Sequence, residues 1–225
     1  MTTQHYNPNG LSPAQLWCLA TSAILTERNG GRHDTLHSNG NHEEEITSLQ
    51  HVLERDWSIS SKKDLLDTLQ WLKTEGHNVG YMDLQHQLTT MSETAIGHYI
   101  HANRHNSKLH SSLILIKNYR RRLRKGGIRA WDDGRYISLC RWGATTGFIS
   151  EDEAWSLMIP VGQQIQRSFK DWHNFGISYI AGRQYWQSQL SQEHAETQME
   201  YFYTLFHEEY SPWRVTAWHT DLNQE

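Results

Sequence analysis

Apolar residues recur at helical spacing along most of the chain, and no segment alternates apolar and polar residues as a strand would. Ser12 as N-cap, with Pro13 at the first helical position, predicts a first helix that runs to the glycine pair at 30–31. Residues 31–42 lack this periodicity and are expected to form a loop, and residues 1–10 are expected to be a flexible N-terminus.

The rest of the chain continues the helical pattern. Helices are predicted at 43–57, 60–76, about 83–105, 107–125, 150–159, about 171–191 and about 194–208. Gly76 should end the second of these as its C′ residue, and Ser150 with Glu153 should form a capping box. The sequence therefore predicts an all-α protein, a single compact domain over residues 1–225 with about eight or nine helices.

The segment "AWDDGRYISLCRWGATTGFISEDEAW" at 130–155 places charges where apolar residues are expected. At about 100° per residue, its large apolar residues gather on one broad side of a helix: Trp131, Tyr136, Leu139, Cys140 and Trp142. Asp132 and Arg135 fall within that side, whereas Arg141 points elsewhere. Arg183 lies likewise inside the aromatic stripe of the 171–191 helix, and Glu27 shares the direction of the apolar residues in the first helix.

Buried charges must pair, bind a ligand or reach water, because an isolated one is too costly. One interpretation is an ion-pair network joining three helices, in which Asp132 and Glu27 neutralise Arg135 and Arg183. The other is a pocket whose guanidinium groups accept a carboxylate or a phosphate. A third is that the helical phase is wrong, or that Glu27 simply reaches water.

Two further groups of polar residues carry candidate chemistry. His77, directly after Gly76, could act as an acid or base or could pack back on the helix as part of its C-terminal cap. Lys117, Arg120, Arg121 and Arg124 form a basic stripe that suits a solvated face or an acidic partner protein better than nucleic acid. No recognised metal-ligand spacing, phosphate-binding loop or nucleophile motif occurs, so neither a metal site nor a cofactor is predicted.

Composition narrows the class of protein. The net charge is −4 and the pI is near 6.4, so the chain as a whole has no bias toward nucleic acid or anionic membranes. The two cysteines have no metal-ligand spacing and are expected to be buried thiols. With no apolar run long enough to span a membrane and no export signal, we expect a cytoplasmic protein.

Three segments resemble a bacterial family called domain of unknown function 1266: "WSISSKKDLLDTLQWLKTEGH" at 57–77, the 130–155 segment above, and "DWHNFGISYIAGRQYW" at 171–186. Asp171 departs from the family pattern, which more often has serine there, although either residue can cap a helix. The resemblance implies a compact helical bacterial protein and supplies no reaction. The first hypothesis for function is therefore an interaction module, an accessory to or antagonist of another protein; the alternative is an enzyme or small-anion-binding protein that uses the Arg/Asp pocket. Oligomeric state is left open.

Overall fold

The computed structural model describes the whole chain except residues 1–6, 8, 38–41, 124–125, 189–191 and 224–225. The helices are α1 (Pro13–Thr21), α2 (Ala23–Arg28), α3 (Glu43–Trp57), α4 (Lys62–Thr74), α5 (Asn78–Thr89), α6 (Glu93–Ala102), α7 (Ser107–Tyr119), α8 (Arg129–Thr145), α9 (Glu151–Ser168), α10 (Trp172–Gln187), α11 (Gln192–His207) and α12 (Pro212–Val215). No strand occurs among the described residues, which confirms the predicted all-α class.

The described part of the chain has more helices than the eight or nine predicted, with eleven helices of at least six residues and the single turn α12. The predicted first helix breaks at Ser22, where the Ser22 hydroxyl donates to the Leu19 carbonyl (2.8 Å) and the Thr21 hydroxyl donates to the Cys18 carbonyl (2.6 Å). Such hydroxyls compete with the helical backbone bonds. The weak region at 83–105 similarly divides into α5 and α6.

Local capping signals placed several helix ends correctly. Ser12 accepts a hydrogen bond from the Gln15 amide at the start of α1, and Ser150 forms the predicted capping box with Glu153. Gly76 adopts a left-handed φ of +56° directly after α4. The predicted helix at 107–125 instead ends at Tyr119, because the following turn directs Leu123 into the core, where its side chain is only 5% exposed.

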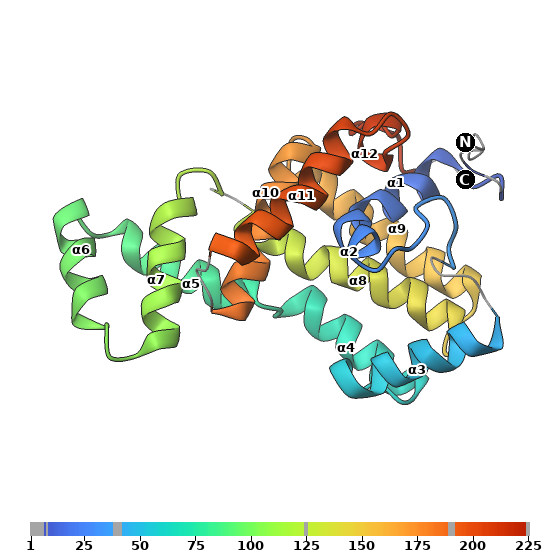
Figure 1. Ribbon diagram of the computed structural model, residues 1–225, viewed down its shortest axis with the longest axis horizontal. Helices are drawn as coiled ribbons and strands as arrows, with labels where there is room; N and C mark the ends of the chain where they lie inside the picture. The colour runs from blue at the N-terminus through green and yellow to red at the C-terminus, as the bar shows by residue number, and fades with distance from the viewer. Residues whose placement is uncertain (1–6, 8, 38–41, 124–125, 189–191, 224–225) are drawn as a thin grey trace.

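Helix α8 is the centre of the fold, and α4, α9 and α10 pack along it (Figure 1). Every residue of α8 except Arg129 and Ala144 is buried, so it has no solvent-facing side. Small residues permit this packing: a Cβ at Gly134 would lie only 2.8 Å from the Tyr179 ring and 3.1 Å from the Thr21 carbonyl oxygen. The one-sided helical wheel predicted from the sequence is therefore incomplete.

Two hydrophobic clusters surround this axis. The larger one includes a group of tryptophans in which Trp172 stacks on Trp213, with ring centroids 5.8 Å apart. The Trp213 indole N–H donates to the Ala20 carbonyl (2.8 Å), so the C-terminal segment is fixed to α1. The smaller cluster lies among α5, α6 and α7, at the end of the molecule away from both termini, and it also includes Ile128 and Ala181.

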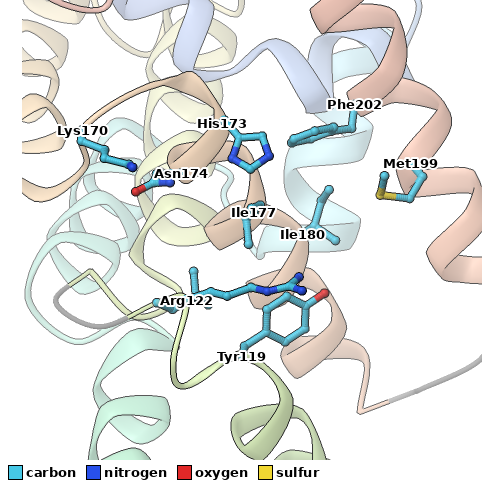
Figure 2. A pocket seen from close by; sticks show the side chains of 10 residues that line it. Tyr119, Arg122, Lys170, His173, Asn174, Ile177, Ile180, Met199 and Phe202 are labelled. Carbon is cyan, nitrogen blue, oxygen red and sulfur yellow. The ribbon is translucent and has the colours of Figure 1, made fainter.

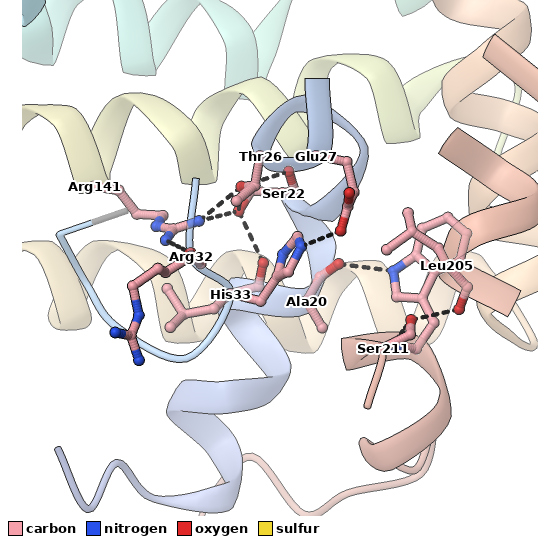
Figure 3. A network of polar contacts seen from close by, with 11 residues as sticks. Ala20, Ser22, Thr26, Glu27, Arg32, His33, Arg141, Leu205 and Ser211 are labelled. Carbon is pink, nitrogen blue, oxygen red and sulfur yellow. Dashed lines mark hydrogen bonds and ion pairs between the residues drawn. The ribbon is translucent and has the colours of Figure 1, made fainter. Parts of the chain in front are cut away.

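Arg141, which the helical wheel directed away from the core, is 1% exposed and is bonded on all sides (Figure 3). Its guanidinium donates to two hydroxyls, those of Ser22 and Thr26 (both 2.9 Å). It also donates to three backbone carbonyls, those of Leu36 (3.1 Å), Arg32 (2.7 Å) and Thr35 (2.8 Å). Burial lowers the pKa of Arg141 to about 9, and the nearby Asp34 carboxyl partly offsets that effect. This one side chain holds the break between α1 and α2 and the following loop against α8.

Replacing Arg141 with methionine should lower the free energy of unfolding by at least about 3 kcal/mol, because several buried acceptors would lose the guanidinium that donates to them. Urea unfolding measures this loss. The matched control is Arg104→Met, since Arg104 is exposed and the change should cost no more than about 0.5 kcal/mol. A loss below about 1 kcal/mol for Arg141→Met would show that water replaces the guanidinium and that the loop does not depend on it.

Candidate functional site

The Asp132 carboxylate joins α8 to the first turn of α5. Its Oδ2 accepts the backbone N–H groups of His77 and Asn78, both at 2.9 Å, and its Oδ1 accepts Arg135 Nη2 at 2.6 Å. The N-terminal amides of a helix have no partner within the helix and carry a partial positive charge, so a carboxylate is a favourable partner for them. Asp132 is 1% exposed and is therefore held by three donors in the interior.

The left-handed turn at Gly76 allows this approach. A Cβ at position 76 would collide with the Asp132 carboxylate, and the positive φ is itself unfavourable for other residues. His77 follows as the N-cap of α5, and its ring packs edge-to-face against Trp71 at 5.4 Å. Arg135 Nη2 lies 3.0 Å from His77 Nδ1 and can donate to it only when that nitrogen is unprotonated.

Arg135 faces both the interior and a cavity. Its Nε donates to the Trp131 carbonyl (3.0 Å), and its guanidinium lies over the rings of Trp131 (4.3 Å) and Trp57 (5.4 Å). Burial lowers the pKa of Arg135, and the Asp132 charge opposes that effect. Its Nη1 makes no hydrogen bond to any described residue, so one side of the guanidinium fork remains available.

The cavity beside Arg135 has a volume of about 690 Å³. It is lined by Leu25, Arg28, Asn29, Glu45, Ser48, Leu49, Val52, Arg55, Asp56, Trp57, Trp131, Arg135, Trp142, Thr145 and Trp186, which come from α2, α3, α8 and α10 and from the residue after α2. Four of these residues are tryptophans. The Trp131 indole nitrogen is buried without a hydrogen-bond partner among the described residues, so a second donor is unsatisfied here.

Of the four charges predicted to converge, the structure brings together only Asp132 and Arg135. Glu27 pairs instead with His33 of the following loop, at 2.6 Å from its Nε2, and 29% of the Glu27 side chain is exposed. Arg183 is 7% exposed, its Nε makes no hydrogen bond, and no ion pair with Asp132 or Glu27 occurs in the described part of the chain. Burial and the neighbouring Arg28 charge both lower the pKa of Arg183.

The predicted basic stripe is not one face of a helix. Lys117 is exposed on α7, whereas Arg120 and Arg121 lie in the turn after α7 and both pair with Glu93, Arg121 at 2.8 Å. Arg124 lies outside the described residues. The stripe is therefore partly neutralised by an acidic side chain of α6, and its role in partner binding stays a prediction.

Asp133 is a buried charge that the sequence did not single out. It is 2% exposed, its Oδ2 makes no hydrogen bond, and Arg129 Nε lies 3.3 Å away in poor hydrogen-bond geometry. Burial raises the pKa of Asp133 to about 7, and the attraction of Arg129 opposes this effect. A contiguous "WDDGR" segment in a helix without a solvent-facing side is the only sequence signal that could have identified it.

Two general features bear on chemistry. No group of three or more histidine, cysteine, aspartate or glutamate side chains is arranged to hold a metal ion among the residues that could be searched. No described helix is both long enough and apolar enough to cross a bilayer.

Replacing Asp132 with alanine should cost roughly 3 to 5 kcal/mol of folding free energy, because Arg135 and the α5 amides would lose their buried partner. Asp132→Asn should cost clearly less, since its amide oxygen can still accept the two backbone N–H groups. Denaturant unfolding of both variants measures the difference. Equal and small losses would mean that water reaches this position in the folded protein.

The Asp133 carboxyl should make stability fall as pH rises from about 4 to about 7. In that range the folded state retains a proton that the unfolded state has lost, because the folded pKa is raised. The slope should approach 1.4 kcal/mol per pH unit at most and should end above pH 7. Asp133→Asn should remove that part of the slope and be most stabilising at pH 8. If the unfolding free energies of the two proteins depend on pH in the same way, burial does not raise the pKa of Asp133.

Comparisons with known proteins agree with the three segments that carry the family resemblance. The chain is 26% identical over 136 residues to "Uncharacterized protein YbeR" of Escherichia coli (strain K12), covering 60% of this chain and 57% of YbeR. It is 25% identical over 148 residues to "Uncharacterized protein YbeU" of the same organism, again 60% and 57% of the two lengths. No solved structure matches the chain. The family described as "Protein of unknown function (DUF1266)" matches residues 52–218, well over half of the sequence, and the chain belongs to that family.

Proposed function

We propose that this protein binds a small organic anion with a flat ring in the tryptophan-lined cavity beside Arg135. The observation that carries the proposal is that the cavity is lined by Arg135, whose Nη1 has no hydrogen-bond partner among the described residues, and by Trp131, whose buried indole N–H also has none. Buried donors without partners are unfavourable, and a carboxylate or phosphate oxygen would satisfy them.

The aromatic walls favour a flat ligand. The rings of Trp131 and Trp186 lie 5.8 Å apart at an interplanar angle of 39°, and Trp57 and Trp142 line the same space. Trp186 is 51% exposed, so its ring forms part of the rim. Indole faces of this kind stabilise planar groups by offset stacking, and the volume lies in the ordinary range for small-ligand sites.

The charges around the cavity favour an anion over a cation. Arg135 and the exposed Arg28 both line it, whereas the carboxylate of Asp56 is already paired with Arg55 (2.6 and 2.8 Å). Glu45 is the remaining acidic residue of the wall, and its Oε2 accepts the His42 backbone N–H at 3.1 Å. Three arginines, Arg28, Arg55 and Arg135, thus line the cavity against two acidic residues, although the whole chain has a net charge of −4.

Titration with 1-naphthoate, followed by tryptophan fluorescence and by calorimetry, tests the proposal. Naphthoate should bind at one site and should raise the melting temperature by mass action. Neutral naphthalenemethanol should bind at least about tenfold more weakly, because a charge-assisted hydrogen bond contributes roughly 1.5 kcal/mol or more. Inorganic phosphate, which has the charge without the ring, should also bind more weakly than naphthoate.

Three variants locate the site. Arg135→Lys keeps a charge beside Asp132 but loses the planar fork, and should weaken naphthoate about tenfold. Trp186→Ala should weaken it about fivefold through lost stacking. Arg104→Lys, distant from the cavity, is the matched control and should change nothing. No binding of naphthoate, or binding that is the same in all three variants, would refute the proposal.

A protein partner, which was the first hypothesis from the sequence, stays a prediction. It rests on the lack of a recognisable catalytic motif in the sequence rather than on a described contact.

A further inference from the structure

A second cavity, of about 630 Å³, lies on α10 between α11 and the turn that follows α7 (Figure 2). It shares no residue with the tryptophan-lined cavity, so an inference from it does not rest on the proposed function. Its floor is one stripe of α10, on which His173, Ile177 and Ile180 follow one another at helical spacing. Residues 173 to 180 make that stripe about 10 Å long at 1.5 Å per residue.

The floor and the walls are mainly apolar. Ile177 and Ile180 lie beneath the cavity, Phe202 and Met199 of α11 form one side, and Leu123 also lines it. Met199 is 52% exposed, and the rings of His173 and Phe202 meet edge-to-face at 5.8 Å. An elongated apolar floor between two walls suits an extended hydrocarbon chain.

The rim of this cavity carries positive charge. Arg122 and Lys170 line the cavity, and no described acidic residue does so. Arg122 is exposed and makes no ion pair with a described residue, and the nearest described acid to Lys170 Nζ is the Asp171 carboxylate at 3.9 Å. Figure 2 shows Arg122 reaching across the opening beside Tyr119, on the side opposite His173.

We propose that this cavity binds a single-chain anionic amphiphile, with an alkyl chain along α10 and a carboxylate or phosphate head at Arg122. The apolar stripe and the rim cations together require a ligand that has both an apolar length and a negative end. A small ligand fits better than a protein segment: the volume is that of a small-molecule site, whereas stable protein interfaces bury more than about 1,000 Å².

Displacement of a fluorescent dansylaminoundecanoate by laurate tests this proposal. Laurate and dodecyl phosphate, each below its micelle concentration, should displace the probe, and each methylene removed from the chain should weaken binding about fourfold. Dodecyltrimethylammonium, with the same chain and the opposite charge, should compete much more weakly. Equal competition by the cation would overturn the proposal, because only non-specific apolar binding would remain.

Substitutions test whether laurate binds in this cavity and not elsewhere on the protein surface. Ile177→Asp should abolish laurate binding by placing a charge on the floor, and Arg122→Glu should weaken it about fivefold. Lys117→Glu, an exposed change on α7 outside the cavity, is the matched control and should leave affinity unchanged. Far-UV circular dichroism checks that each variant folds. If Ile177→Asp unfolds, Ile177→Trp, which fills the cavity without adding charge, replaces it and should also abolish binding.

A vesicle-binding experiment tests whether the ligand is a free amphiphile or the headgroup of a membrane lipid. Sedimentation with phosphatidylcholine vesicles containing phosphatidylglycerol should show no binding that depends on Arg122. Binding to those vesicles without binding to free laurate would overturn the proposal in favour of a membrane-surface contact. Laurate binding that survives both cavity variants would overturn it as well. Neither result bears on naphthoate, which is measured at the other cavity.

Discussion

The burial of α8 on all its sides is the constraint on which the rest of the fold depends. A helix without a solvent-facing side cannot release its polar groups to water, so each must find a partner inside the protein. Of the four buried charged residues on α8, Arg141 and Asp132 obtain their hydrogen-bond partners in different ways. Arg141 donates to neutral oxygens of Ser22, of Thr26 in α2 and of the following loop. Asp132 instead binds the free amides at the start of α5. In both cases the hydrogen bonds that a buried side chain requires also fix a neighbouring segment of the chain.

Asp133 meets this constraint only in part. Its neighbour Arg129 is near but poorly aligned, and one carboxylate oxygen stays without a donor among the described residues. The protein lowers the cost by raising the pKa of this carboxyl, so that it holds its proton until about pH 7. Two adjacent aspartates on one helix therefore differ in their environment, because only one of them faces a helix N-terminus.

The sequence revealed most where the signal was local. The cap at Ser12, the capping box at Ser150 and the left-handed Gly76 each depend on a few neighbouring residues, and all three were predicted. The break at Ser22 was missed, because its hydroxyl is used by Arg141 from a distant helix. Interactions between segments far apart in sequence cannot be read from a periodicity.

The same limit explains the candidate site. A helical wheel correctly identified Asp132 and Arg135 as buried, since both lie among large apolar residues of one helix. It directed Arg141 away from the core because it assumed a solvent-facing side that α8 does not have. It also joined Glu27 to the network, whereas a loop histidine, His33, is its partner. A loop has no periodicity from which such a contact could be inferred.

Structural and ligand-binding roles are often treated as alternatives for a buried charge, but the proposed function gives Arg135 both. A guanidinium has donors on several sides, and a rigid planar fork can use them independently. Nη2 and Nε are engaged by Asp132 and the Trp131 carbonyl, which fixes the plane of the group. Arg135 also lines the cavity, and its Nη1 has no hydrogen-bond partner among the described residues. Under the proposed function, the ion pair that fixes the guanidinium plane would also position a donor for the ligand, while Asp132 binds the α5 amides on its other side.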